Sequence, residues 1–151
     1  MRAVVQRVLQ ASVSVEEERV GACAGGMLVL IAVAHEDTLD DARWLARKLA
    51  GLRIFRDDAG RMNRSLLDAE GEALVISQFT LYGDCRRGRR PSFVSSAPPG
   101  IAEPLYQSFC ECLAEEGIRV SRGIFGAEMA VTSVNDGPVT LIVDTPSRSS
   151  S

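Results

Sequence analysis

The chain has 151 residues, 46% hydrophobic and 25% charged, with a formal net charge of −3. This length fits one domain with a substantial core, and the balance is that of an ordinary soluble globular protein. The longest apolar run, residues 27–34, is too short to span a bilayer, and the first residues lack a signal-peptide pattern. We therefore expect a single domain over residues 1–145, a disordered Ser-rich tail over 146–151, a cytoplasmic location and no membrane partner.

The N-terminal half predicts strands followed by a helix. A Gly-Gly turn separates the second expected strand from a third, apolar and central one. Thr38 predicts the N-cap of a helix that runs to about Leu52, with leucines three and four positions apart on one face. A loop is expected over residues 57–63. The expected strands cover residues 3–15 (one bent strand or two), 19–24 and 27–34.

The C-terminal half predicts a strand, a second helix and more strands. The helix begins near Ile101, with Pro104 in its first turn, and ends at Gly117. Between the last two strands, the Asn-Asp-Gly-Pro stretch favours a hairpin turn. The expected strands cover residues 73–82, 118–121, 129–134 and 139–143. Two strands, two βα units and three final strands predict a mixed α/β, β-rich fold with two helices on one face.

Cysteine and histidine spacing argues against a metal site or a disulfide scaffold. No two of Cys23, Cys85, Cys110 and Cys112 form a CxxC pair, and the last two face different ways in a helical pattern. The only histidine, His35, is expected at the surface before the first helix. We therefore expect no metal and no cofactor.

Arginines cluster in one short stretch of this slightly acidic chain. Of 17 basic residues only Lys48 is lysine, and four arginines fall within five positions: Arg86, Arg87, Arg89 and Arg90. Such a run is usually a solvated loop, although guanidinium groups also suit phosphates. Both interpretations stay open at this point.

The common catalytic motifs are missing from the sequence. It has no GxSxG elbow, Walker loop or GxGxxG fingerprint. Three polar side chains, Ser77, Gln78 and Thr80, follow an apolar strand, which indicates either a strand leaving the core or a binding site. Thr80 lacks an adjacent base to activate it as a nucleophile. Backbone N–H groups at this strand end, and carbonyls in the Gly-Pro turn, remain for chemistry.

Two stretches, SQFTLYGDCRRGRRPSF and FGAEMAVTSVNDGPVT, together resemble the D-aminoacyl-tRNA deacylase family. The resemblance extends from residue 1 to about 144 and implies an α/β/β layered fold. It implies hydrolysis of the ester that joins a D-amino acid, or glycine, to the 3′-terminal adenosine of tRNA. It also implies a homodimer in which Gly137 and Pro138, joined by a cis peptide bond, face residues 77–80 of the partner.

The resemblance assigns roles to individual residues. Backbone N–H groups near Phe79 and Thr80 would hold the ester carbonyl, while the carbonyls of Gly137 and Pro138 would fix the amino acid so that an L side chain clashes with the backbone. Thr80 is either a nucleophile or a positioning group, and Gln78 contacts the adenosine or orders the loop. Three further residues complete the expected site, with Phe125 and Met129 lining the adenine pocket and Arg7 bracing the Gly-Pro turn.

Arg86, Arg87, Arg89 and Arg90 are then expected to contact tRNA phosphates. Two alternatives of other classes remain: a hydrolase of small metabolites that uses Thr80 as nucleophile, and a non-catalytic RNA-binding module. DNA is not an expected partner, because no recognition helix accompanies the arginine-rich loop.

Overall fold

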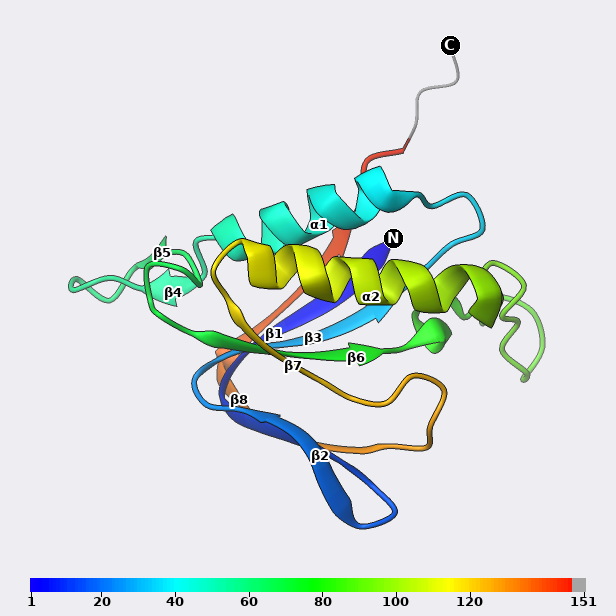
Figure 1. The fold of residues 1–151 in the computed structure, drawn as a ribbon, viewed down its shortest axis with the longest axis horizontal. Helices are drawn as coiled ribbons and strands as arrows, with labels where there is room; N and C mark the ends of the chain where they lie inside the picture. Colours follow the sequence, from blue (N-terminus) through cyan, green and yellow to red (C-terminus); the bar gives the residue numbers. More distant parts are fainter. Residues whose placement is uncertain (148–151) are drawn as a thin grey trace.

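The computed structural model describes residues 1–147, so most of the tail expected over 146–151 lies outside the described residues. A six-stranded sheet forms the body of the molecule, and two α-helices lie side by side over one of its faces (Figure 1). No helix within the described range is long and apolar enough to cross a membrane.

The first strand, β1 (Arg2–Val15), organises the sheet because it pairs along both edges. On one edge it pairs antiparallel with β3 (Gly26–Ala32) and then with β2 (Glu18–Cys23), and on the other with β8 (Ala130–Asp144). The stretch expected as one bent strand or two is thus one strand. Its alternating pattern buries every second side chain at first, which is what a strand between solvent-facing and core-facing sides requires.

The centre of the sheet is parallel. β6 (Glu72–Ser77) pairs parallel with β3 and carries β7 (Arg119–Arg122) parallel on its other edge. Nearly every residue of β3 is buried, as expected for a central strand covered on both faces. One hydrophobic cluster packs under the helices, and a second, which includes Leu28 and Leu74, lies on the opposite face. The expected α/β/β layering stays a prediction, since all six strands form one hydrogen-bonded sheet.

The two helices begin and end close to the predicted positions. α1 (Leu39–Gly51) has Thr38 as its N-cap, and a capping box with Asp41 closes its first turn. α2 (Pro99–Glu115) starts two residues earlier than expected, because Pro99 suits the first helical position. Pro104 consequently lies in the second turn rather than the first.

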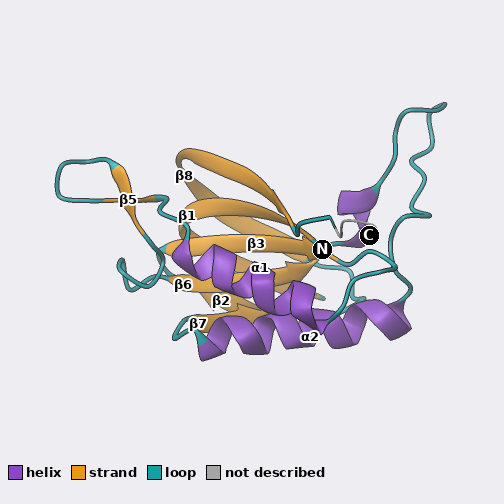
Figure 2. Cartoon of the chain, turned by 90° about the horizontal axis from the view of Figure 1, so that it is seen from above, coloured by secondary structure: helices purple, strands orange, loops and turns teal. Residues whose placement is uncertain are grey.

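Three predictions about local structure are wrong. The strand expected over 73–82 ends at Ser77, and a 3-10 helix, η1 (Phe79–Tyr82), follows. The loop expected over 57–63 ends at residue 61, because residues 62 and 63 belong to a short strand, β5 (Met62–Arg64), which pairs with β4 (Phe55–Arg56) as a hairpin. Figure 2 shows this hairpin at one end of the sheet and the loop that follows η1 at the other.

The third error concerns the Gly-Pro stretch, which does not reverse the chain. Residues 129–134 and 139–143, expected as two strands, belong largely to the single strand β8, so two strands rather than three follow α2. Asn135 pairs with Val8 and Thr140 with Gln6, so both flanks continue antiparallel to β1 in the same direction. The intervening residues form a bulge, in which one strand carries more residues than its partner.

Candidate active site

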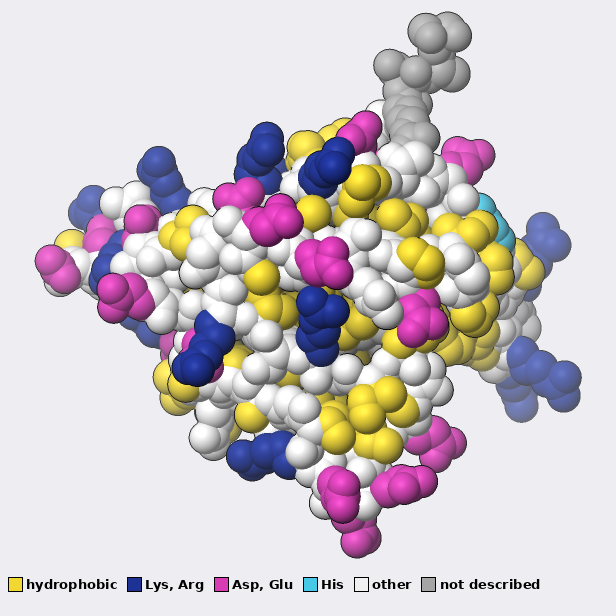
Figure 3. All heavy atoms as spheres, viewed as in Figure 1, with side chains coloured by type: hydrophobic (Ala, Val, Ile, Leu, Met, Phe, Trp, Pro, Cys, Tyr) yellow, Lys and Arg dark blue, Asp and Glu magenta, His cyan; other side chains and the backbone are white. Residues whose placement is uncertain are grey.

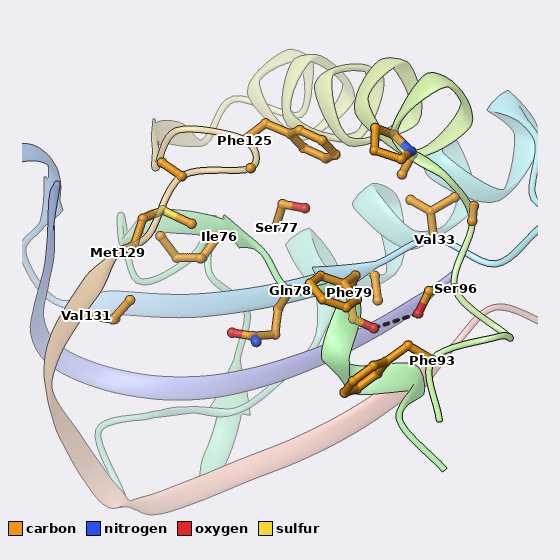
Figure 4. Close-up of a pocket in the computed structure, with 16 residues that line it drawn as sticks. Val33, Ile76, Ser77, Gln78, Phe79, Phe93, Ser96, Phe125, Met129 and Val131 are labelled. Carbon is orange, nitrogen blue, oxygen red and sulfur yellow. Dashed lines mark hydrogen bonds between the residues drawn. The ribbon is translucent and has the colours of Figure 1, made fainter. Parts of the chain in front are cut away.

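A cavity of about 520 Å³ opens at the carboxyl end of β6. Five residues that the sequence analysis selected line this cavity. They come from two segments more than forty positions apart, and Figure 4 shows them around the space. The lining residues that the sequence predicted are Ser77, Gln78, Phe79, Phe125 and Met129. Among residues 1–147, no Asp, Glu, His, Lys or Arg lines this cavity, so its described walls are apolar side chains, hydroxyl and amide groups, and backbone.

The end of β6 is fixed by contacts with the neighbouring strand and with the loop before α2. The Gln78 N–H donates to the carbonyl of Ile31 at 2.8 Å, after which the chain turns into η1. Ser96 Oγ donates to the Phe79 carbonyl at 2.8 Å (Figure 4). The Phe79 and Phe93 rings meet edge to face with centroids 5.3 Å apart. Sequence reasoning missed Ser96 and Phe93. Phe93 is the last residue of the quoted stretch SQFTLYGDCRRGRRPSF, whereas Ser96 lies beyond it and carried no signal.

Thr80 lies just outside the cavity lining and is exposed. The Gln78 side-chain amide donates a hydrogen bond to Thr80 Oγ1. Among the described residues, no carboxylate or imidazole bonds to this hydroxyl. The N–H groups of Phe79 and Thr80 open the 3-10 helix, and neither donates to a backbone carbonyl within residues 1–147. The arrangement therefore offers hydrogen-bond donors at the cavity rather than a nucleophile paired with a base.

The wall formed by the loop between β7 and β8 is closely packed. The Phe125 ring lies 5.9 Å, centroid to centroid, from Tyr106, whose hydroxyl donates to the Val75 carbonyl at 3.1 Å. Burial raises the pKa of Tyr106, so this hydroxyl stays a neutral donor. A Cβ added at Gly123 would lie 2.6 Å from the Met129 sulfur, so only glycine lets Met129 occupy this position.

The Gly-Pro segment, defined here as residues 135–139, lies at the opposite end of the sheet from the cavity. Asn135 pairs with Val8, Val8 with Gly26, and Gly26 with Glu72, the first residue of β6, whereas the cavity opens at the last. Neither Gly137 nor Pro138 lines the cavity of its own chain.

The peptide bond between Gly137 and Pro138 is cis, as the resemblance implied, and Gly137 has a φ of 125°, which favours glycine. Asn135 Nδ2 closes the bulge by donating to the carbonyls of Arg7 at 3.0 Å and Val139 at 3.1 Å. The expected contact with Arg7 is present. Arg7 is only 3% exposed, its Nη1 donates to the Ile54 carbonyl at 2.7 Å, and its Nε lies 3.2 Å from Asp136 Oδ2.

The four arginines of the loop are not equivalent. Arg86 donates to both carboxylate oxygens of Asp84, at 2.9 and 2.7 Å, and this contact lowers the pKa of Asp84 to about 2. Arg87, Arg89 and Arg90 are exposed and form no ion pair within residues 1–147. Dark blue side chains project at the right-hand end of Figure 3, where Figure 1 places this loop. Three of the four guanidinium groups thus face solvent without a competing carboxylate.

His35, the single histidine of the sequence, does not line the cavity. His35 is exposed, and its Nε2 lies 2.7 Å from the Val94 carbonyl, so it contacts the loop before α2. Nowhere in the described chain do three His, Cys, Asp or Glu side chains gather as a metal site would require.

Comparisons with known proteins agree on one family. The model for D-Tyr-tRNA(Tyr) deacylase matches residues 4–144. The D-aminoacyl-tRNA deacylase of Geobacter sulfurreducens is 56% identical over 151 residues, covering 100% of this chain and 99% of that protein. Its counterpart from Thermus aquaticus is 55% identical over 148 residues, or 98% and 97% of the two chains. A solved structure described as a c-Myc DNA unwinding element binding protein is 40% identical, with a TM-score of 0.91 over 97% of this chain and 100% of that one.

Proposed function

Because this chain belongs to the D-Tyr-tRNA(Tyr) deacylase family, we propose that it hydrolyses the ester bond of D-aminoacyl-tRNA and of tRNA mischarged with glycine. The products are tRNA and the free amino acid. The reaction removes D-amino acids from tRNA in the cytoplasm, before they can be used in translation. The observation that carries this proposal is the cavity at the end of β6, which brings Ser77 to Phe79 together with Phe125 and Met129 and has no charged lining residue in the described chain.

Donors at the cavity supply the chemistry in this proposal. An aminoacyl ester is already activated, so placement and charge stabilisation suffice for its hydrolysis. The N–H groups of Phe79 and Thr80 bind the ester carbonyl and the negative charge that develops on it. Thr80 acts as a positioning group, because its hydroxyl bonds to Gln78 and has no base beside it, and the adenosine 2′-OH assists the attack of water. The contact with Thr80 supports Gln78 as a residue that orders the loop.

The adenine ring occupies the wall formed by Phe125 and Met129. An aromatic ring and a thioether give an apolar surface on which a base can stack. Exposed Arg87, Arg89 and Arg90 then contact phosphates of the same tRNA, and Arg86 joins them only if it leaves Asp84. These are sequence-independent contacts, so they add affinity without choosing the amino acid.

Chirality is read by the Gly-Pro segment of a second copy of the chain. Among the described strands β8 pairs only with β1. A homodimer interface on β8 would bury its exposed apolar side chains, which are Val131, Val134, Leu141 and Ile142. The carbonyls of Gly137 and Pro138 hold the amino acid in place, so that an L side chain overlaps with them, whereas glycine has no side chain to reject. Each tenfold of discrimination requires only about 1.4 kcal/mol, which a steric overlap easily supplies.

The decisive experiment is deacylation of matched D- and L-tyrosyl-tRNA by the purified chain in the presence of a chelator. We expect rapid loss of the D ester only. Equal loss of both esters would contradict the chiral mechanism. Loss of small aminoacyl esters that requires Thr80 would favour the metabolite hydrolase, and tRNA binding without cleavage would favour the RNA-binding module. Duplex DNA should compete poorly with tRNA. This competition also tests whether DNA binding, which the name of the 40%-identical structure states, occurs in this chain.

A further inference from the structure

A carboxylate beside the Gly-Pro pair is held by two arginines from different parts of the fold. Arg56, in β4, donates from Nη1 to Asp136 Oδ2 at 2.9 Å and from Nη2 to Oδ1 at 3.2 Å. Arg7, in β1, approaches the same Oδ2 with Nε at 3.2 Å. A fork of two parallel N–H···O bonds fixes the orientation of a carboxylate as well as its position.

The two arginines differ in their surroundings. The Arg7 side chain is 4% exposed and that of Arg56 is 50% exposed. Arg7 Nε is buried and has no aligned hydrogen bond within residues 1–147, so its contact with Asp136 is ionic. The hydrogen bonds from Arg56 lower the pKa of Asp136, with the charge of Arg7 acting in the same direction, so the carboxylate is ionised at neutral pH. Asp136 therefore connects a buried charge to an exposed hairpin.

The bulge needs such a connection because the sheet does not restrain it. Register along β1 passes from Asn135 directly to Thr140, so the residues between them have no ladder partner on β1. Gly137 has the freest backbone of any residue type, and it follows Asp136 directly. The contacts of Asn135, Asp136 and Arg7 therefore restrain the segment that carries the two carbonyls.

We propose that Asp136 is a positioning residue for the Gly137–Pro138 carbonyls and that Arg56, through Asp136, makes the β4–β5 hairpin a determinant of chiral selectivity. This inference rests on the proposed function, since it concerns how the Gly-Pro segment rejects L esters. Steric rejection depends steeply on distance, so a small release of the segment admits an L side chain while a D ester still binds.

The test compares full-length variants with a control from the same hairpin. Asp136→Asn keeps the shape and removes the charge, Arg56→Ala removes the fork, and Arg56→Lys keeps only a point charge. Arg61→Ala removes an exposed arginine from the loop joining β4 to β5, whose side chain forms no ion pair in the described chain. For each, kcat and KM are measured separately on D- and L-tyrosyl-tRNA, and thermal unfolding checks the fold.

We expect Asp136→Asn to lower the D-to-L ratio of kcat/KM about tenfold or more, mainly through faster L hydrolysis at unchanged KM for the D substrate. Arg56→Ala should lower the ratio by roughly three- to tenfold, with partial recovery in Arg56→Lys, while Arg61→Ala stays within about twofold of wild type. Combining Arg56→Ala with Asp136→Asn should add little to Asp136→Asn alone, because both act through one contact.

Several outcomes would overturn the inference. Unchanged ratios in folded Asp136→Asn and Arg56→Ala would show that the contact is only structural. An equal fall in D and L hydrolysis, or the same effect in Arg61→Ala, would do so too. If Asp136→Asn does not fold, the half-exposed Arg56 variants decide. A wild-type chain without chiral selectivity would instead remove the proposed function itself, so the two failures are distinguishable.

Discussion

The cavity at the end of β6 and the Gly-Pro segment of β8 are built in contrasting ways. No charged residue that the structure describes lines the cavity, and its polar atoms are fixed by neutral hydrogen bonds such as that from Ser96 to Phe79. The Gly-Pro segment is held through its own carboxylate, Asp136, by two arginines from other strands, Arg7 and Arg56. Packing and neutral hydrogen bonds therefore determine the geometry of the region proposed to bind adenosine. Ionic contacts instead position the backbone that is proposed to distinguish D from L esters. Substitutions in the two regions should therefore alter different kinetic constants.

The largest effect should come from Gly137→Ala. A Cβ there would lie 2.9 Å from Arg7 Nη2 and from Val139 Cγ2, and alanine disfavours a φ of 125°. A strained backbone residue costs of order 1–3 kcal/mol, which lowers the population of the competent conformation roughly 5- to 150-fold. We expect kcat/KM on D-tyrosyl-tRNA to fall by about that factor, as measured by single-turnover deacylation. Wild-type activity in this variant would contradict the assigned role.

On the cavity side, Phe125→Ala should weaken substrate binding without changing chirality. Stacking of one base on an aromatic ring contributes about 1–3 kcal/mol, so KM should rise roughly 5- to 150-fold at an unchanged D-to-L ratio. Initial rates over a range of tRNA concentrations separate the two constants. A changed ratio would show that the cavity wall also reads the amino acid.

Thr80→Ala distinguishes positioning from nucleophilic catalysis. A positioning hydroxyl that shares one hydrogen bond with Gln78 should cost about 1 kcal/mol, or roughly fivefold in kcat. A nucleophile would cost on the order of 1,000-fold or more. Rapid-quench measurement of the first turnover decides between them, and detection of an acyl-enzyme would overturn the positioning role.

Removing charge from the arginine-rich loop should act on neither region. Arg89→Ala combined with Arg90→Ala should reduce the slope of log affinity against log salt by about 1.4–1.8, which corresponds to two lost phosphate contacts. Filter binding of tRNA between roughly 50 and 200 mM salt tests this. Arg86→Ala is the matched control and should change the slope less, because Asp84 already holds that guanidinium.

As the pH falls, the Gly-Pro segment should lose its ionic contacts with Arg7 and Arg56 before the cavity is affected. The pKa of Asp136 is lowered by Arg56, so this ion pair contributes above the ordinary carboxyl pKa and is lost as the pH falls through the lowered value. The D-to-L ratio should therefore decline below about pH 4 in the wild type and stay flat in Asp136→Asn. A parallel decline in both proteins would place the effect elsewhere.

Much of this arrangement could be predicted where the signal is local. The apolar run before Ser77, the N-cap at Thr38 and the leucine spacing of α1 each reflect neighbours in sequence, and the structure confirms those elements within a few residues. The meeting of Phe125 and Met129 with Ser77 to Phe79 was implied by the resemblance and is present.

Non-local pairing explains what could not be predicted. Asn-Asp-Gly-Pro has the composition of a hairpin turn, but β1 is long enough to pair with both flanks, so tertiary contacts override the local preference. The contact between Arg56 and Asp136 joins residues 80 positions apart, so no local sequence pattern predicts it. The same holds for Ser96, whose hydrogen bond to Phe79 depends on how the loop before α2 folds back.

The register of the sheet has a consequence for mixtures of variants. Five residue-to-residue steps along β6, from Glu72 to Ser77, separate the level of the Gly-Pro segment from the mouth of the cavity, which is roughly 17 Å along the strand. In the proposed homodimer each site therefore draws its cavity from one subunit and its Gly-Pro segment from the other. A dimer of one Phe125→Ala chain and one Gly137→Ala chain would combine both defects in one site and leave the second site fully wild type. Two impaired proteins, mixed and allowed to exchange subunits, should restore activity that neither has alone.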